Sequence, residues 1–304
     1  MRFFLALLCL VSSALAETYQ DPKAAAFYAE HPDFFRFAKP ADLPKDLVWQ
    51  DGSEQKEFAD PRAVRGGVLR QFTTSTPPTL RRVGPNANNG FRGELYDNND
   101  FGLLAGHPDT DEIIPALATS WAMSADGMTA YFRLDPNAKF TDGQPVTVDD
   151  YFYTFYFHRS PWAKADWYAD HYTREWGGVT KYDDHTLAVK APRKRPYQLE
   201  LLGGLRPTPR QFFKDFGPNY EKAYNDRFHP TTGPYYVKPD GFLREKSITL
   251  TRVTDWWGDR RKYYRHRYNP DAILDGVIRD LDSAYSSMLA GEIDFMPIMM
   301  PRYW

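Results

Sequence analysis

Alternating hydrophobic and polar positions predict three β-hairpins. In residues 118–134 the alternation runs on both sides of a Ser-Ala-Asp-Gly turn sequence. A second pair of alternating strands, within residues 177–192, turns at an Asp-Asp pair. A third pair, within residues 229–253, is expected to turn at the Pro-Asp-Gly sequence of residues 239–241. Antiparallel strands joined by short turns therefore make up much of the predicted structure.

Three aspartates, Asp142, Asp149 and Asp150, fall within nine residues and raise the question of a cation site. Thr147 stands where a helix N-cap would, and Asp150 follows three residues later, as in a capping box. This pattern predicts a helix over residues 148–158. A calcium loop would need oxygen ligands at alternate positions around a central glycine, which this stretch lacks. We therefore expect the carboxylates to hold a turn and to cap the helix.

The remaining segments predict a mixed α+β protein of the α/β class. Residues 68–72 read as a short buried strand after two glycines, and weaker helical patterns cover residues 93–104 and 197–202. Near the end of the sequence a β-α-β unit is expected, with a crossover helix between two strands. Its parts are a strand at 273–278, a helix at 283–289 with Gly291 as C-cap, and a strand at 293–298.

The first residues have the pattern of a secretory signal peptide. Arg2 gives a positive start, an apolar run follows, and Ala14-Leu15-Ala16 is a typical cleavage ending, so residues 1–16 are expected to be removed. A lipoprotein cut at Cys9 is disfavoured by the bulky residue before it. Residues 17–65 form a polar, proline-spaced extension that we expect to lie across the surface of the domains that follow.

Composition narrows the possible partners. The chain has 38 lysines and arginines against 40 acidic residues, a formal charge of −2, which argues against nucleic acid as a partner. Aromatic residues make up 16% and are spread along the chain, which favours a protein that holds soluble ligands by stacking. Cys9 is the only cysteine and lies in the predicted signal peptide, so no disulfide is expected.

Motif searches favour a protein that is not an enzyme and that uses no cofactor or metal. The sequence has no nucleophile elbow, zinc-protease motif, Walker loop or dinucleotide fingerprint, and no two histidines have local ligand spacing. The pairs Asp149-Asp150 and Asp183-Asp184 could suggest a glycosidase. Adjacent residues point apart on a helix or a strand, however, and glycoside hydrolysis needs two carboxyls that face one bond.

Motifs in order along residues 66–295 resemble the family 5 extracellular solute-binding proteins of ABC transporters, the oligopeptide-binding type. They are "IIPALATSWAMSADGMTAYFRLDPNAKFTDGQPVTVDDYFYTFYF", "YDDHTLAVKAP", "TTGPYYV", "SITLTRVTDWWGD" and "SSMLAGEIDF". The resemblance implies a periplasmic protein, monomeric at full length, that captures peptides or similar solutes and passes them to ABC permease subunits. A secreted carbohydrate-active enzyme is the main alternative, and a purely structural periplasmic protein is a third.

The same resemblance implies a type II-like periplasmic binding protein fold with two lobes. Lobe I would comprise residues 66–110 and 195–280, with a small domain inserted at 111–194. Residues 281–304 would begin lobe II, which in this family is much longer. We therefore expect the sequence to be the N-terminal part of a longer chain and, because the resemblance implies that lobe II supplies one wall of the ligand cleft, we expect this part alone to bind no peptide measurably.

The family's ligand contacts can be carried over only to a few positions. The loop "VGPNANNGF" offers Asn86, Asn88 and Asn89 as hydrogen-bonding groups, and the segment after the capped helix offers Trp162, Trp167 and Tyr168 as aromatic contacts. Trp257 occupies the second position of the family's Tyr-Trp pair. The alternative interpretation is that the asparagines shape a turn and the aromatic residues belong to the core.

Overall fold

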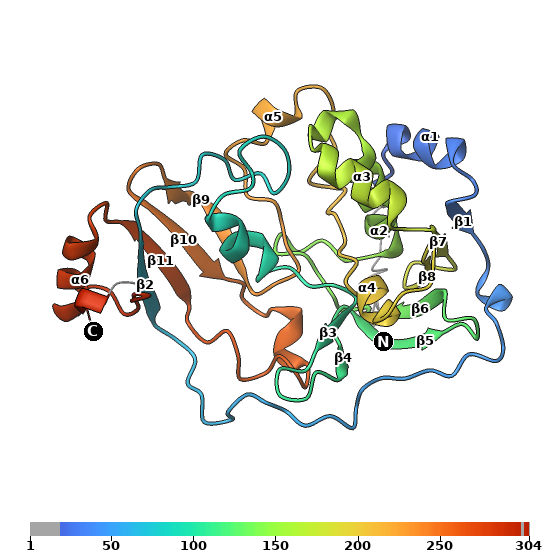
Figure 1. The fold of residues 1–304 in the computed structure, drawn as a ribbon, viewed down its shortest axis with the longest axis horizontal. Helices are drawn as coiled ribbons and strands as arrows, with labels where there is room; N and C mark the ends of the chain where they lie inside the picture. The colour runs from blue at the N-terminus through green and yellow to red at the C-terminus, as the bar shows by residue number, and fades with distance from the viewer. Residues whose placement is uncertain (1–18, 299–300, 304) are drawn as a thin grey trace, which may run out of the picture.

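A computed structural model describes residues 19–298 and 301–303, so the predicted signal peptide lies outside the described residues. Two β-sheets lie side by side along the long axis of the molecule (Figure 1). A third, two-stranded sheet joins β3 (Leu104–Gly106) to β4 (Ile113–Pro115). Strands and helices both contribute to the fold, as the sequence predicts.

The first sheet contains two of the predicted hairpins. Its order is β1-β7-β8-β6-β5, with antiparallel pairing except between β1 and β7. Both hairpin turns fall where the alternation predicts them. The strand bounds are β1 Phe35–Phe37, β5 Ala118–Met123, β6 Thr129–Leu134, β7 Gly178–Lys181 and β8 Thr186–Lys190.

Helix α2 (Val148–Arg159) covers one face of this sheet and is almost completely buried. Thr147 is its N-cap, and the Asp150 carboxylate accepts a hydrogen bond from the Thr147 amide at 2.9 Å, so the predicted capping box is confirmed. In the preceding turn the Asp142 carboxylate accepts a hydrogen bond from the Gln144 backbone amide at 3.1 Å. No cluster of three or more potential metal ligands occurs among residues 19–298 and 301–303.

The N-terminal extension contributes more regular structure than its prolines suggest. Helix α1 (Pro22–Glu30), which the sequence reading missed, packs on α2 and is capped by Asp21. Strand β1 then extends the first sheet along its edge. Leu43, Leu47 and Trp49 pack on the face of the sheet opposite α2, and the following residues run along one side of the molecule toward β2 (Figure 1). The extension therefore connects the two sheets across the surface.

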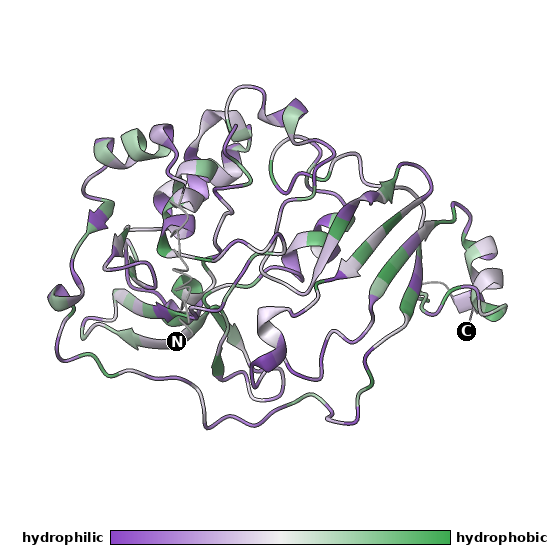
Figure 2. Cartoon of the chain, turned by 180° about the vertical axis from the view of Figure 1, so that it is seen from behind, coloured by the Kyte–Doolittle hydropathy of each residue, from purple (hydrophilic) through white to green (hydrophobic). Residues whose placement is uncertain are grey.

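The second sheet has the order β2-β11-β10-β9. Figure 2 shows hydrophobic positions spread along its strands. The sequence predicts that β2 (Val68–Thr73) is buried, and this is wrong. The strand lies at the edge of the sheet, and Val68 is 52% exposed. The helical pattern at 93–104 is realised only in part, as the π-type turn η2 (Gly93–Asp97). The other strands are β9 Tyr235–Leu243, β10 Ser247–Arg252 and β11 Ala272–Val277.

The predicted turn at residues 239–241 is wrong. Strand β9 continues through these residues, and the chain reverses after Leu243 instead. Val237 pairs with Leu250 and Phe242 pairs with Ile248, so residues 238–241 form a bulge opposite a single residue of β10. An edge strand tolerates such a bulge and the missing amide proton of its proline.

The predicted β-α-β unit forms only in its first two parts. After β11, helix α6 (Leu281–Leu289) begins two residues earlier than predicted, with Asp280 as N-cap, and Gly291 follows in a left-handed conformation. Residues 293–298 form no strand. Ile293 and Met296 instead pack against α6. The Asp294 carboxylate accepts hydrogen bonds from the backbone amide and the guanidinium of Arg70 on β2, and the Asp294 amide donates to the Arg70 carbonyl.

Short helices connect these elements. The predicted helix near residues 197–202 is confirmed as α4 (Gln198–Gly203). The others are α3 Asp166–Arg174, α5 Tyr220–Ala223 and the 3-10 turns Pro40–Asp42, Pro161–Ala163, Trp257–Arg260 and Pro301–Tyr303.

Gly233 allows a close approach between the start of β9 and the chain after η2. A Cβ at this position would lie 2.1 Å from the backbone oxygen of Asn99, a buried residue whose amide bonds the backbone of Tyr235. We expect Gly233→Ala to lower the free energy of unfolding by about 1–3 kcal/mol, because the backbone must move. Gly106→Ala is the control, since its Cβ would meet no atom within 4 Å. Equal urea midpoints for the two variants would contradict this packing.

Candidate functional site

A groove of about 560 Å³ lies between the loop after β2 and the segment that links α2 to α3. Its size is within the range usual for small-ligand sites. The groove brings Asn88, Trp167 and Tyr168 together from the sequence-predicted set. Its lining residues are Arg82, Val83, Gly84, Ala87, Asn88, Arg92, Asp97, Lys164, Ala165, Asp166, Trp167 and Tyr168.

The two aromatic residues are presented by the first turn of α3, a helix without buried residues. Trp167 is 69% exposed and stacks on His171, with ring centroids 5.2 Å apart. Tyr168 stacks on the buried His158 at 5.1 Å, and the Arg92 guanidinium lies over the Tyr168 ring at 5.3 Å. Both rings are thus held in place by neighbours, and Trp167 still offers a large exposed apolar surface for stacking.

Charged side chains of both signs line the groove. Arg92 pairs with Asp97 at 3.2 Å, and Arg82 pairs with the buried Asp100 at 2.5 Å. Asp100 also accepts hydrogen bonds from the backbone amide and the hydroxyl of Thr232, so this ion pair is fixed at the base of the groove. The groove combines polar groups with aromatic surface, which suits a ligand of mixed character such as a peptide.

The asparagines of the loop differ in their environment. Asn88 is exposed and lines the groove. Asn89 uses its amide within the turn: its oxygen accepts from the Phe91 amide at 3.0 Å and its nitrogen donates to the Asn86 carbonyl at 3.0 Å. Asn86 has a left-handed backbone with φ of 62°. Asn86 and Asn89 thus shape the loop that carries Asn88.

Two of the predicted aromatic residues lie elsewhere. Trp162 packs against Phe216, with ring centroids 5.7 Å apart, and Lys23 lies over its ring. Trp257 is only 9% exposed, and its indole nitrogen donates to the Thr232 carbonyl at 2.8 Å. The structure does not bring either one into the groove with Trp167. Sequence reading in turn missed Arg82, Arg92 and Lys164, because ordinary basic residues carry no local signal of a groove.

A carboxyl pair, formed by the partly buried Glu94 and the buried Asp275, connects η2 to β11. Glu94 of η2 accepts a hydrogen bond from Gln71 of β2 at 3.3 Å, and its carboxyl lies next to that of Asp275 on β11. Burial raises the pKa of Asp275 to about 7, with a further contribution from Glu94, and burial also raises the pKa of Glu94. At acidic pH the pair can therefore share a proton.

The comparisons with known proteins agree on one family. Residues 112–304 match the model of "Bacterial extracellular solute-binding proteins, family 5 Middle". The periplasmic oligopeptide-binding protein OppA of Escherichia coli is 30% identical over 68% of this chain and 38% of its own length. The probable peptide-binding protein YejA of Agrobacterium fabrum is 26% identical over 85% of this chain and 42% of its own length. The chain thus spans about two fifths of these relatives.

Solved structures show the same fold. The oligopeptide-binding protein AppA of Bacillus subtilis, in complex with a nonapeptide, has a TM-score of 0.60 at 19% identity, over 77% of this chain and 44% of that protein. The periplasmic binding protein DppA of Helicobacter pylori, in complex with a peptide, has a TM-score of 0.60 at 20% identity, over 76% and 46%. The predicted type II periplasmic binding protein fold is confirmed.

Proposed function

The chain belongs to the family 5 bacterial extracellular solute-binding proteins, and on that premise we propose that it forms part of the substrate-binding component of an ABC importer for peptides or peptide-like solutes. The relatives named above are binding proteins, so an enzyme of carbohydrate metabolism, the alternative expectation, finds no support among them. Members of the family act outside the cytoplasm. We accordingly place this chain in the periplasm, exported by residues 1–16, where it would deliver its solute to permease subunits.

The groove beside Trp167 is the observation that carries this proposal. The exposed indole gives a flat apolar surface for a side chain of the peptide, and Asn88 on the opposite wall can donate to and accept from a peptide group. Arg92 and Asp97 offer one charge of each sign at the same wall. Such a surface would accept peptides of varied sequence, because the hydrogen bonds go to the peptide backbone and the indole can stack on different apolar side chains.

Titration of the 304-residue chain with a pool of pentapeptide amides that lack Asp and Glu tests the proposal. Because all the lining residues of the groove lie within residues 82–168, we expect binding by calorimetry even without lobe II, in contrast to the expectation from the sequence. We also expect a loss of at least about tenfold in affinity for Trp167→Ala, because truncating a central aromatic contact commonly costs more than about 1.4 kcal/mol. Asn88→Ala should weaken binding by a smaller factor.

Phe37→Ala is the matched control, because Phe37 is 66% exposed, much like Trp167, but lies on the edge strand β1. The Phe37→Ala variant should bind the peptide pool with the same affinity as the wild type. Equal losses in Phe37→Ala and Trp167→Ala, or no loss in either, would place peptide binding elsewhere.

A further inference from the structure

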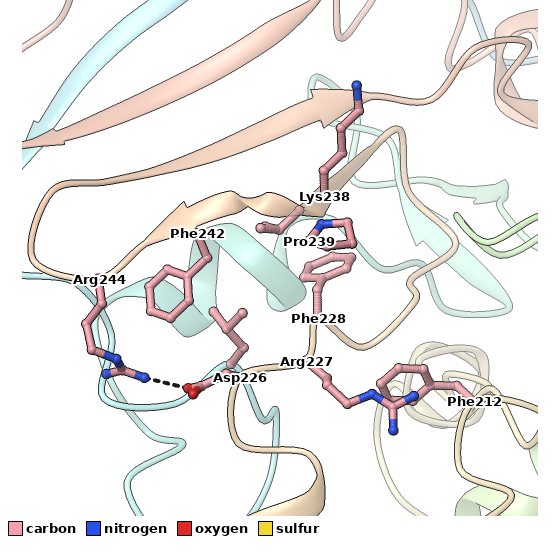
Figure 3. Close-up of a pocket in the computed structure, with 10 residues that line it drawn as sticks. Phe212, Asp226, Arg227, Phe228, Lys238, Pro239, Phe242 and Arg244 are labelled. Atoms are coloured by element: carbon pink, nitrogen blue, oxygen red, sulfur yellow. Dashed lines mark hydrogen bonds and ion pairs between the residues drawn. The ribbon is translucent and has the colours of Figure 1, made fainter.

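A second cavity, of about 480 Å³, lies against the bulged edge strand β9 (Figure 3). It is separate from the groove at Trp167, since the two share no lining residue. The wall on the β9 side includes Pro239 and Phe242, and the segment before β9 contributes Phe228. The bulge at residues 238–241 thus shapes one side of this cavity.

The middle of the cavity is apolar. Phe228, Phe242, Pro239 and Leu80 line it, and Phe228 stacks on the buried Tyr96 with ring centroids 5.4 Å apart. That stacking fixes the Phe228 ring, so the surface is preformed. A flat or branched apolar group of a ligand would gain contact here without a rearrangement of the protein.

The two ends of the cavity differ in charge. At one end Arg244 pairs with Asp226 at 2.5 Å, so both charges are matched. At the other end the Arg227 guanidinium lies over the rings of Phe212 and Tyr224, at 4.6 and 4.8 Å. Within the described part of the chain, no carboxylate lies within ion-pair distance of Arg227. Stacking holds this exposed guanidinium in place, and the N–H groups that do not bond the Tyr224 hydroxyl can still bind an anion.

We propose that this cavity binds a small carboxylate with an apolar body, with the carboxylate on Arg227 and the apolar part between Phe228 and Phe242. A planar guanidinium binds a carboxylate through two parallel hydrogen bonds, which a lysine could not match. The matched pair at the other end keeps the Asp226 charge from repelling such a ligand. This site is independent of the proposed peptide groove.

N-Acetylphenylalanine and its uncharged amide are suitable probes, because they differ only in the carboxylate. We expect calorimetry to show binding of the acid to the 304-residue chain and at least tenfold weaker binding of the amide. Arg227→Gln should remove this preference for the acid. Lys238→Gln is the control, since it also removes one positive charge, and the Lys238 ammonium points away from the cavity in Figure 3.

The two sites can be tested separately. Trp167→Ala should bind the acid as the wild type does, and Arg227→Gln should bind the pentapeptide amide pool as the wild type does. Equal affinity of the wild type for acid and amide, a preference for the acid that persists in Arg227→Gln, or no binding of either probe would each overturn the proposal. A loss of the preference in Lys238→Gln as well would show a general charge effect and overturn it too.

Discussion

Replacing Asp150 with alanine is expected to lower the free energy of unfolding by about 3–5 kcal/mol, because it removes the nearer carboxylate from the buried Arg210 and leaves that guanidinium with the more distant Asp149, at 3.8 Å. Asp150 and Arg210 pair at 2.9 Å, with side chains only 3% and 4% exposed. The same carboxylate also caps α2 through the Thr147 amide. Removing it therefore costs both the ion pair and the cap, and urea unfolding followed by tryptophan fluorescence measures the sum.

Asp142→Ala is the matched control from the same stretch. Asp142 is exposed and accepts a hydrogen bond only from the nearby Gln144 amide, so its loss should cost less than about 1 kcal/mol. If both variants lost the same amount, the buried pair would not be what holds α2 in place. A rise in melting temperature with added calcium, present in the wild type and absent in Asp142→Ala, would restore the cation site that the sequence argues against.

Asp275→Asn is expected to change how stability depends on pH. The pKa of Asp275 is about 7 in the folded protein and about 4 in an unfolded chain, so the folded state binds the extra proton between these values. The free energy of unfolding of the wild type should therefore fall by about 2–4 kcal/mol as the pH rises from about 4 to 7, relative to Asp275→Asn. Urea unfolding at a series of pH values measures this difference.

The comparison with Asp275→Asn isolates the carboxyl pair from the buried histidines. Burial lowers the pKa of His158 and His229, so their contribution has the opposite sign, but it is the same in both proteins. Asp271→Asn, at an exposed carboxyl just before β11, should keep the wild-type profile. Parallel profiles for the wild type and Asp275→Asn would mean that Glu94 and Asp275 do not share a proton.

The elements that sequence reading found correctly are those with local signals. The first two hairpins follow from alternation and a turn sequence, and α2 follows from Thr147 and Asp150 alone. The turn of the third hairpin was placed wrongly, because a Pro-Asp-Gly sequence can also form a bulge on an edge strand. That β9 is an edge strand cannot be predicted from the sequence of β9 alone. Hydrophobic and polar residues alternate in residues 293–298 as they would in a strand, but these residues pack against α6 and do not pair with a strand.

The candidate site depended on distant parts of the sequence. A resemblance to a family made Trp167 and Asn88 candidates, and the structure places both at one groove, but nothing in their local pattern separates them from Trp162 or Asn89. Only the packing of the loop after β2 against α3 decides which side chains share a groove. Arg92 is held at the groove by stacking on the Tyr168 ring. The two residues are 76 positions apart, so no local sequence pattern indicates this contact.

Photo-crosslinking tests the central claim, that peptides bind at the groove beside Trp167, most directly. A pentapeptide amide that carries benzoylphenylalanine would be irradiated with the 304-residue chain, and the attachment sites would be read by mass spectrometry. We predict attachment within residues 82–97 and 164–168, suppressed by excess unlabelled pool and by Trp167→Ala. Competed attachment elsewhere on the chain, or none that unlabelled peptide suppresses, would contradict the account.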